Sequence, residues 1–330
     1  MTSVKPLFLT LLALALPAFA AKNLEIYFVD VEGGQATLVK SPEGQSILFD
    51  TGWPGFDNRD ANRIAAAAQK AGISKIDYLV VTHFHTDHVG GLTQLAAKMP
   101  IANLVDHGKT VESNANAEKL YAAYEALAAK ARRITVKPGD KLPVKGLTVE
   151  VLAAHGVATT RPGKANPLCA GVEKKADDAT DNGQSVGMVI TYGKFRFLDL
   201  GDLTWNKELE LVCPENKIGK IDLYLTTHHG ADSSGPAALV HAIAPTVAVM
   251  NNGEKKGGSP AAWKVVRQSP GLKDLWQLHF AAAGGPENNT GEQLIANLKG
   301  EDSGNHIAVT AQSNGKFTVT NSRNGFSKSY

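Results

Sequence analysis

Runs of apolar residues of strand length recur along the chain and alternate with two helical patterns. The runs that we expect to form strands are residues 24–31, 35–40, 46–52, 75–81, 147–154, 185–193 and 194–202. The Ala-rich segment 60–71 ends before Gly72 and predicts a helix, and a second helix is expected over residues 115–133. This mixture of strands and helices is typical of an α/β protein.

Two other stretches have a different pattern. Residues 161–183 lack periodicity and contain two prolines, which predicts a long surface excursion. Residues 306–326 predict a hairpin that turns at Ser313-Asn314-Gly315. Because no linker or low-complexity segment divides the rest of the chain, we expect one domain over residues 21–330.

A weak internal repeat relates two parts of the chain. ILFDTGW (47–53) resembles RFLDLGD (196–202), and KIDYLVVTHFH (75–85) resembles KIDLYLTTHHG (220–230). Two pairings in the same order predict two similar β-rich halves that face each other. Each half would then offer polar side chains from the ends of its strands.

The first twenty residues differ in character from the rest. An apolar run over 7–16 is followed by Ala18-Phe19-Ala20, the small-x-small form of a signal-peptidase site. The run is short for a membrane anchor, so we expect residues 1–20 to be a signal peptide and the protein to be periplasmic or extracellular. No later segment is apolar enough to cross a membrane. In an oxidising compartment Cys169 and Cys213 form either a disulfide or two free thiols.

The overall charge limits the class of partner. The chain has 34 Lys and Arg against 32 Asp and Glu, a formal net charge of +2. This near-balance argues against a protein that grips long nucleic acid by bulk charge. We therefore expect a small-molecule or nucleotide-type substrate.

The densest chemistry lies in VTHFHTDHVGG (81–91). His83 and His85, two apart on an extended stretch, point the same way and can share one ion, whereas Asp87 and His88 can address a second. The alternative, a solvated polar loop, fits poorly with the buried strand before this cluster and the double glycine after it.

Three later residues complete the candidate site. Asp202 closes FLDLGD and could bridge two ions, or cap a helix that begins near Leu203. The repeat places His228 over His83 and favours His228 as a ligand, which leaves His229 to face the substrate or donate a proton. The reverse order of the two histidines stays open.

The HxHxDH cluster, Gly201-Asp202 and His228-His229-Gly230 resemble the metallo-β-lactamase superfamily. With Asn182 and Ser185, the pattern is most similar to the β-lactamase-like domain of ComEC-type competence proteins. The resemblance implies an αββα sandwich of two pseudo-symmetric halves around two divalent ions, zinc in the first place and manganese as the alternative.

The resemblance also implies how the ions are shared. The ligands of the first ion would be His83 and His85, those of the second Asp87, His88 and His228, with Asp202 between them. Many members have a third histidine for the first ion in a Gly-His turn that this chain lacks. The candidates for that position are His155, Asp181 and Asn182.

These residues predict metal-assisted hydrolysis, with Asp87 holding the attacking hydroxide in line and no serine or cysteine nucleophile. ComEC-like features favour phosphodiesters or other phosphate esters. An amide or lactone hydrolase, including a β-lactamase, is the alternative, and a non-catalytic metal-binding protein is the third hypothesis. His107 and His279 could line the pocket, but we interpret them as surface or core histidines. Lys255, Lys256 and Ser259 could meet an anionic group, although a solvated charged loop is the favoured interpretation.

Overall fold

The computed structural model describes residue 1 and residues 22–330, so the predicted signal peptide lies, Met1 apart, outside the described residues. Within the described part of the chain, no helix is both long enough and apolar enough to cross a bilayer.

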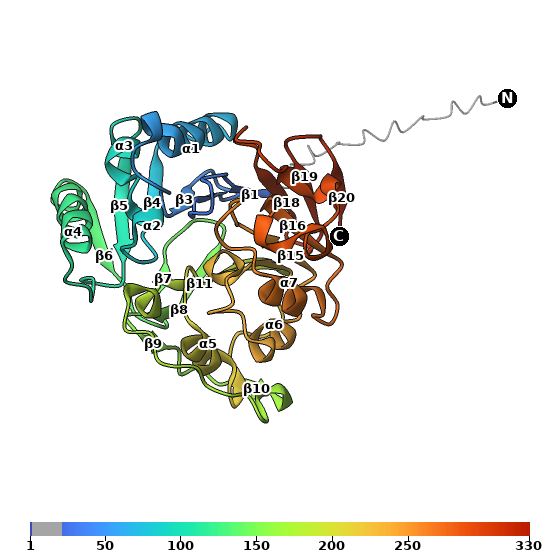
Figure 1. Ribbon diagram of the computed structural model, residues 1–330. Helices are drawn as coiled ribbons and strands as arrows, with labels where there is room; N and C mark the ends of the chain where they lie inside the picture. The colour runs from blue at the N-terminus through green and yellow to red at the C-terminus, as the bar shows by residue number, and fades with distance from the viewer. Residues whose placement is uncertain (2–21) are drawn as a thin grey trace.

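The first sheet contains the N-terminal and the C-terminal strands of the described chain (Figure 1). Its nine strands are β1 (Leu24–Phe28), β2 (Thr37–Lys40), β3 (Ser46–Phe49), β4 (Ile76–Val80), β5 (Ile101–Asp106), β6 (Arg132–Thr135), β18 (Ile307–Ala311), β19 (Phe317–Asn321) and β20 (Ser327–Ser329). Their order is β20-β19-β18-β1-β2-β3-β4-β5-β6, antiparallel as far as β3 and parallel from β3 to β6. The predicted C-terminal hairpin is confirmed as β18 and β19.

The second sheet repeats this plan. Its strands are β7 (Lys141–Leu142), β8 (Thr148–Ala154), β9 (Val157–Ala158), β11 (Gly187–Tyr192), β12 (Phe195–Asp199), β14 (Leu223–Leu225), β15 (Val247–Met250), β16 (Asp274–His279) and β17 (Ile295–Asn297). Pairing is antiparallel from β7 through β8 and β11 to β12, and parallel from β12 through β14, β15 and β16 to β17.

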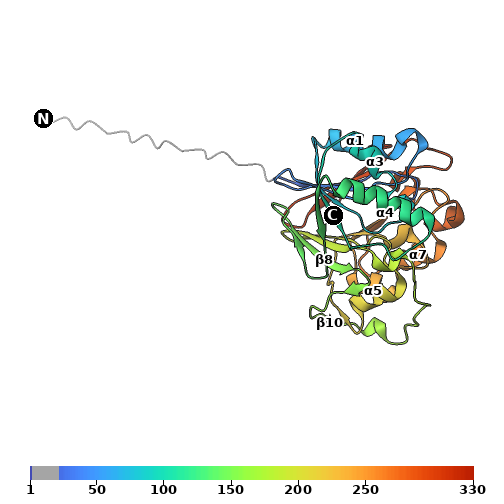
Figure 2. The same ribbon diagram turned by 90° about the vertical axis from the view of Figure 1, so that its left-hand side faces the viewer.

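Helices cover the outer faces of the two sheets, which pack face to face (Figure 2). The helices are α1 (Arg59–Lys70), α2 (Thr86–Val89), α3 (Leu92–Ala96), α4 (Ala115–Ala128), α5 (Trp205–Val212), α6 (Ala237–Ile243) and α7 (Pro260–Arg267). One apolar cluster lies between the sheets, a second joins the first sheet to α1, α3 and α4, and a third joins the second sheet to α5, α6 and α7. The predicted αββα sandwich is confirmed.

The alternation of apolar residues along the strands explains these layers. In β1, Ile26 and Phe28 belong to the cluster between the sheets, whereas Tyr27 belongs to the outer cluster. Across the interface the rings of Phe28 and Phe197 meet edge to face with centroids 5.7 Å apart. Each sheet is therefore buried on both faces over its centre, which matches the near-continuous apolar runs of its parallel strands.

The internal repeat corresponds to two equivalent strand–helix–strand units. Strand β3, helix α1 and strand β4 form one, and β12, α5 and β14 form the other, with parallel pairing in both. Asp50 directly follows β3 and Asp199 is the last residue of β12, and both of these equivalent residues of the repeat are buried. The carboxyl ends of the parallel strands in each half carry the side chains described below.

Two expectations about local structure need correction or completion. The helix expected over 115–133 ends at Ala128, because Arg132–Thr135 pairs in parallel with β5 as β6. The Nε atom of Arg133 lies 2.7 Å from an Asp106 oxygen, which fixes this segment to the sheet. The excursion 161–183 contains β10 (Lys164–Ala165), paired with β13 (Glu215–Asn216), and a disulfide joins Cys169 to Cys213.

Candidate metal centre

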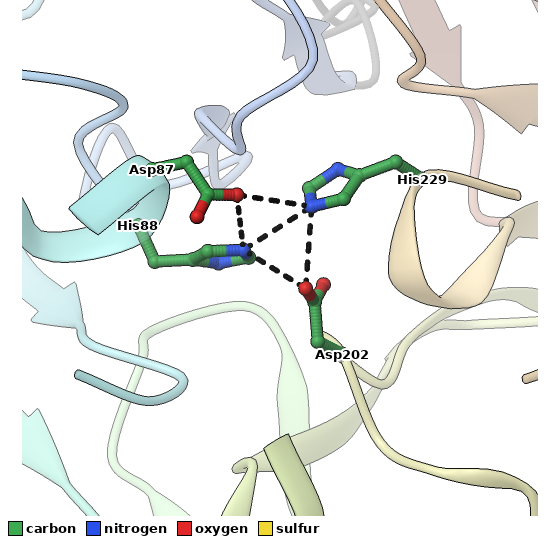
Figure 3. Close-up of side chains that lie close together, drawn as sticks. All are labelled: Asp87, His88, Asp202 and His229. Atoms are coloured by element: carbon green, nitrogen blue, oxygen red, sulfur yellow. Dashed lines mark hydrogen bonds and ion pairs between the residues drawn. The ribbon is translucent and has the colours of Figure 1, made fainter. Parts of the chain in front are cut away.

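Four buried side chains from the two halves converge at the carboxyl ends of the parallel strands (Figure 3). They are Asp87, His88, Asp202 and His229, and one ligand atom from each lies within 4.8 Å of the others. His88 Nε2 is 3.1 Å from Asp87 Oδ2 and 3.2 Å from Asp202 Oδ2. His229 Nε2 is 3.3 Å from each of the same two oxygens. We call these four residues the metal cluster.

The two halves contribute equally to the metal cluster. Asp87 and His88 lie on the short helix α2, directly after the loop that follows β4. Asp202 follows β12, and His229 lies in the turn after β14. The equivalent strand ends of the repeat therefore meet at one point, as the repeat predicts.

Opposite charges within the metal cluster shift the pKa values of its members. Burial opposes protonation of His88, but the carboxylates of Asp202, Asp87 and Asp50 raise its pKa well above the ordinary value. Burial likewise favours a neutral Asp202, but the pKa of Asp202 is held well below its usual range by His229 and His88. Two carboxylates kept ionised in a buried site make strong ligands for a cation.

Asp50 fixes the orientation of His88. Its Oδ2 atom lies 2.7 Å from His88 Nδ1, and it also accepts hydrogen bonds from the backbone N–H and the hydroxyl of Thr82. Because Nδ1 is engaged by this carboxylate, Nε2 is turned towards Asp87 and Asp202. Such an outer carboxylate–histidine pair is typical of metal sites.

His83 and His85 border the metal cluster on one side. His83 is fully buried, and its Nε2 atom has no hydrogen-bond partner among the described residues and lies 4.0 Å from Asp202 Oδ2. Burial, and after it the neighbouring His88, holds the pKa of His83 well below the ordinary value. The imidazole rings of His85 and His83 pack with their centroids 4.6 Å apart, and His85 Nε2 lies 2.6 Å from Glu112 Oε1. The neutral, unpartnered His83 nitrogen fits a metal ligand.

The structure orders the two late histidines differently from the favoured expectation. His229 belongs to the metal cluster, whereas His228 lies at its edge, 19% exposed, with Nε2 at 3.4 Å from Asp202 Oδ2 and Nδ1 at 2.9 Å from Ser233 Oγ. Both histidines and Gly230 have positive φ. His83 has no positive φ, so the left-handed turn has no counterpart there and the aligned positions do not present their side chains alike.

The candidates for a third ligand of the first ion have different surroundings. Asp181 accepts the backbone N–H groups of Phe84 and Val111 and pairs with His107, so it braces the loop that carries His83. His155 is exposed in the turn after β8. Neither joins the metal cluster.

Asn182 is buried, and its Oδ1 atom has no hydrogen-bond partner among the described residues. The same is true of Asp202 Oδ1. Asp202 Oδ1 and His83 Nε2 are groups of the cluster and its border that a bound cation would satisfy. The residues present therefore fit the divalent ions that the sequence predicts.

The sequence favoured a solvated loop for Lys256 over contact with an anionic group, yet its Nζ atom contacts Asp87 Oδ2. The same ammonium lies 5.0 Å from the centre of the Trp53 ring. Lys256 lies in the loop after β15. The backbone N–H of Gly258 in this loop donates a hydrogen bond to the carbonyl oxygen of His229, which joins the loop to the turn of residues 227–230 that we call the histidine turn. Strand β15 is parallel to β14, so a residue that follows β15 lies at the same edge of the sheet as the histidine turn. The position of Lys256 after a strand could therefore have indicated a site residue, but the charged character of the loop favoured a solvated surface.

A second group of possible ligands, Asp30, Glu32 and His279, lies outside the metal cluster. His279 Nε2 is 2.7 Å from Asp30 Oδ1, and Arg63 pairs with the other Asp30 oxygen at 2.9 Å. An arginine already supplies positive charge there. His279 is thus a buried histidine of an ion-pair network, in line with the expectation for it.

Comparisons with known proteins place this geometry in a family. Residues 29–163 match the metallo-beta-lactamase superfamily. Recombination protein 2 of Haemophilus influenzae is 26% identical over 227 residues, which are 68% of this chain and 24% of that protein. ComE operon protein 3 of Bacillus subtilis is 24% identical over 243 residues, which are 70% of this chain and 28% of that protein. Ribonuclease Z of Methanopyrus kandleri is 30% identical over 160 residues, 44% of this chain and 54% of that protein.

Residues 29–163 of the chain thus match the metallo-beta-lactamase superfamily, and a protein named as a metal-dependent hydrolase is among the relatives similar to this chain. The similarity of the chain to the two competence-type proteins confirms the ComEC-like resemblance. The matched region makes up about a quarter of each of those two relatives.

Proposed function

We propose that the protein is an exported hydrolase with two divalent ions, which acts on phosphodiesters or other phosphate esters. The observation that carries the phosphate preference is the ammonium group of Lys256 at Asp87. A cation at this point can bind an oxygen of a phosphoryl group beside the metal cluster. The name of the similar ribonuclease Z is consistent with this preference.

The side chains divide between two ion positions. Asp87, His88 and His229 would hold one ion, His83 and His85 the other, with Asp202 shared. Four imidazoles and two carboxylates favour zinc, and manganese is the alternative if Asn182 adds a further oxygen. When bound, such ions supply a water with its pKa lowered to roughly 7 and positive charge that stabilises the transition state.

The remaining groups position the substrate and the proton. Lys256 would bind a non-bridging phosphoryl oxygen, and Asp87 would hold the attacking oxygen in line. His228 is the proposed proton donor to the leaving oxygen, because Ser233 engages its Nδ1 atom and the residue is partly exposed at the edge of the cluster. This role was assigned to His229 from the sequence alone.

Export is proposed on two observations. The segment 1–20 has the composition of a signal peptide. The disulfide between Cys169 and Cys213 is typical of proteins in oxidising compartments.

The test compares two substrates on protein reconstituted separately with Zn²⁺ and Mn²⁺. Bis-p-nitrophenyl phosphate reports phosphodiester hydrolysis and a chromogenic cephalosporin reports lactam hydrolysis, with His88→Ala/Asp202→Ala as the blank. We expect turnover of the phosphodiester only. Turnover of the cephalosporin alone, lost in the blank, would replace the proposal by lactam hydrolysis.

Lys256→Ala tests the observation that carries the proposal. We expect kcat/KM for the phosphodiester to fall about ten- to a hundredfold, as for the loss of one hydrogen bond to a charged group. Lys255→Ala is the matched control, because Lys255 is the exposed neighbour on the same loop. Equal rates in the two variants would mean that Lys256 does not touch the substrate.

A further inference from the structure

A cavity of about 1070 Å³ lies at the far side of the second sheet from the first. It is lined by residues 161–168, residues 216–220 and Ala242, and none of these belongs to the metal cluster. Figures 1 and 2 place β10, which forms part of its wall, at the lower end of the molecule, beyond α5. We call this cavity the strap pocket.

The wall of the strap pocket is held in place at several points. Strand β10 pairs with β13, and the disulfide between Cys169 and Cys213 joins the segment after β10 to the end of α5. The buried Asn166 amide donates to the carbonyls of Val212 and Ala238, at 3.0 and 3.1 Å. A pocket with such a fixed wall loses little conformational freedom when it binds a ligand.

The lining of the strap pocket carries cations and no carboxylate. The cationic residues are Arg161, Lys164, Lys217 and Lys220. Arg161 is compensated by Glu150, with atoms 2.7 Å apart, and the Lys217 ammonium donates to the carbonyl of Glu210. Within residues 22–330, Lys164 and Lys220 have no carboxylate oxygen within 4.0 Å of Nζ. Two exposed positive charges at one pocket attract an anion.

The remaining lining is largely apolar. Pro162, Pro167, Leu168 and Ile218 contribute to it, and Leu168 is 42% exposed although most large apolar side chains of the protein are buried. Pockets that bind small organic molecules combine an apolar lining with a few polar or charged groups, and volumes of roughly 300–1,000 Å³ are usual. The strap pocket has this composition, and its volume lies slightly above that range.

We propose that the strap pocket binds a small amphipathic anion, a molecule with an apolar body and one acidic group. The apolar body would lie against Leu168 and the two prolines, and the acidic group would lie between Lys164 and Lys220. This site is independent of the hydrolytic centre and of its substrate. Its cations are too few for a long polyanion, whose binding needs several phosphate contacts.

Two dyes of matched shape test the proposal. 8-Anilinonaphthalene-1-sulfonate carries an acidic group, and N-phenyl-1-naphthylamine has the same aromatic body without it. We expect fluorescence titration of the folded, metal-loaded protein to give saturable binding of the sulfonate, with the neutral dye bound at least tenfold more weakly. Decanoate should displace the sulfonate, and decanol should not.

Charge reversal at the pocket supplies the decisive comparison. Lys164→Glu/Lys220→Glu should raise the dissociation constant of the sulfonate at least tenfold. The control Lys119→Glu/Lys130→Glu, which changes one exposed lysine of α4 and one exposed lysine just after it, should leave the dissociation constant unchanged. Unaltered thermal unfolding and hydrolase activity show that each variant is folded. Equal affinity of the two double variants, or equal affinity of the wild type for both dyes, would overturn the proposal.

Discussion

Asp50 illustrates how a residue that is no metal ligand shapes the centre. It is fully buried, and burial raises its pKa, against the opposing effect of His88. The carboxylate is nevertheless tied to the imidazole at 2.7 Å, so each group supports the charge of the other. Its counterpart in the second half, Asp199, receives the side-chain amide of Gln35 instead of a histidine.

This difference predicts unequal effects of the same substitution in the two halves. Asp50→Asn should weaken zinc binding about ten- to a hundredfold, because His88 loses its charged partner. Asp199→Asn, the same substitution at the equivalent strand end, should change the affinity less than twofold. Competition with a chromophoric chelator measures both, and equal affinities would contradict the role given to Asp50.

A second buried carboxyl, Glu208 of α5, lies beneath the histidine turn. One of its oxygens accepts the backbone N–H of Gly235 at 2.6 Å. Burial raises the pKa of Glu208 from 4.5 to about 8, although Thr227 and Gly235 act in the opposite direction. At neutral pH this carboxyl is therefore mostly protonated in the folded protein and ionised in the unfolded chain.

The raised pKa predicts a pH dependence of stability. The contribution of Glu208 is complete below pH 4.5 and declines as the pH rises to 8, because the unfolded chain releases the proton first. The slope reaches about 1.4 kcal/mol per pH unit for one proton. Glu208→Gln should flatten the decline seen in denaturant unfolding between pH 5 and 8, and Glu210→Gln, an exposed position on the same helix, should not. Parallel curves for the two variants would refute this assignment.

At the scale of elements, the loop after β15 and the histidine turn are packed without spare room. Gly257 has a φ of +70°, and a Cβ atom there would lie 2.2 Å from His229 O. Gly258 and Ser259 also donate backbone N–H groups to this turn. The loop therefore positions Lys256 and His229 together.

Gly257→Ala should push the loop after β15 away from the histidine turn, because the added methyl group would collide with His229 O. We expect at least a tenfold loss of kcat/KM, in addition to the cost of about 1–2 kcal/mol for alanine in a left-handed conformation. Gly271→Ala is the control, because Gly271 has a φ of +84° and no atom within 4 Å of an added Cβ. That variant should lose stability alone. Equal activity of the two variants, measured with equal metal content, would show that the loop after β15 does not position Lys256 and His229 together.

The same scale shows why part of the secondary structure and site could be predicted. Segments with clear apolar runs, such as 46–52 and 75–81, form strands where expected, since their burial on both faces dictates their composition. The end of α4 was predicted wrongly because β6 depends on pairing with β5, a contact that local pattern does not encode. Likewise, the contact of Lys256 with Asp87 joins residues far apart in sequence.

At the scale of the whole molecule, the internal repeat predicted two facing halves that offer polar side chains from their strand ends, whereas Asp87, His88 and Asp202 were predicted from their own motifs. The repeat could not order His228 and His229, because the left-handed turn has no counterpart at His83. Net charge is similarly limited. The value of +2 describes an average, and it hides the uncompensated Lys164 and Lys220 at the strap pocket.

The pairing of β1 with β18 has a consequence for how the protein is made. Leu24 and Ala311 are partners in register, so one edge of β1, the first strand of the described residues, stays open until β18 has been synthesised. An open strand edge invites pairing with other chains until it is filled. During vectorial synthesis, that edge would stay open until residues 307–311 have been made. Closure of the first sheet is thus a late event, and a prematurely terminated chain would leave β1 exposed for capture by a chaperone or a protease.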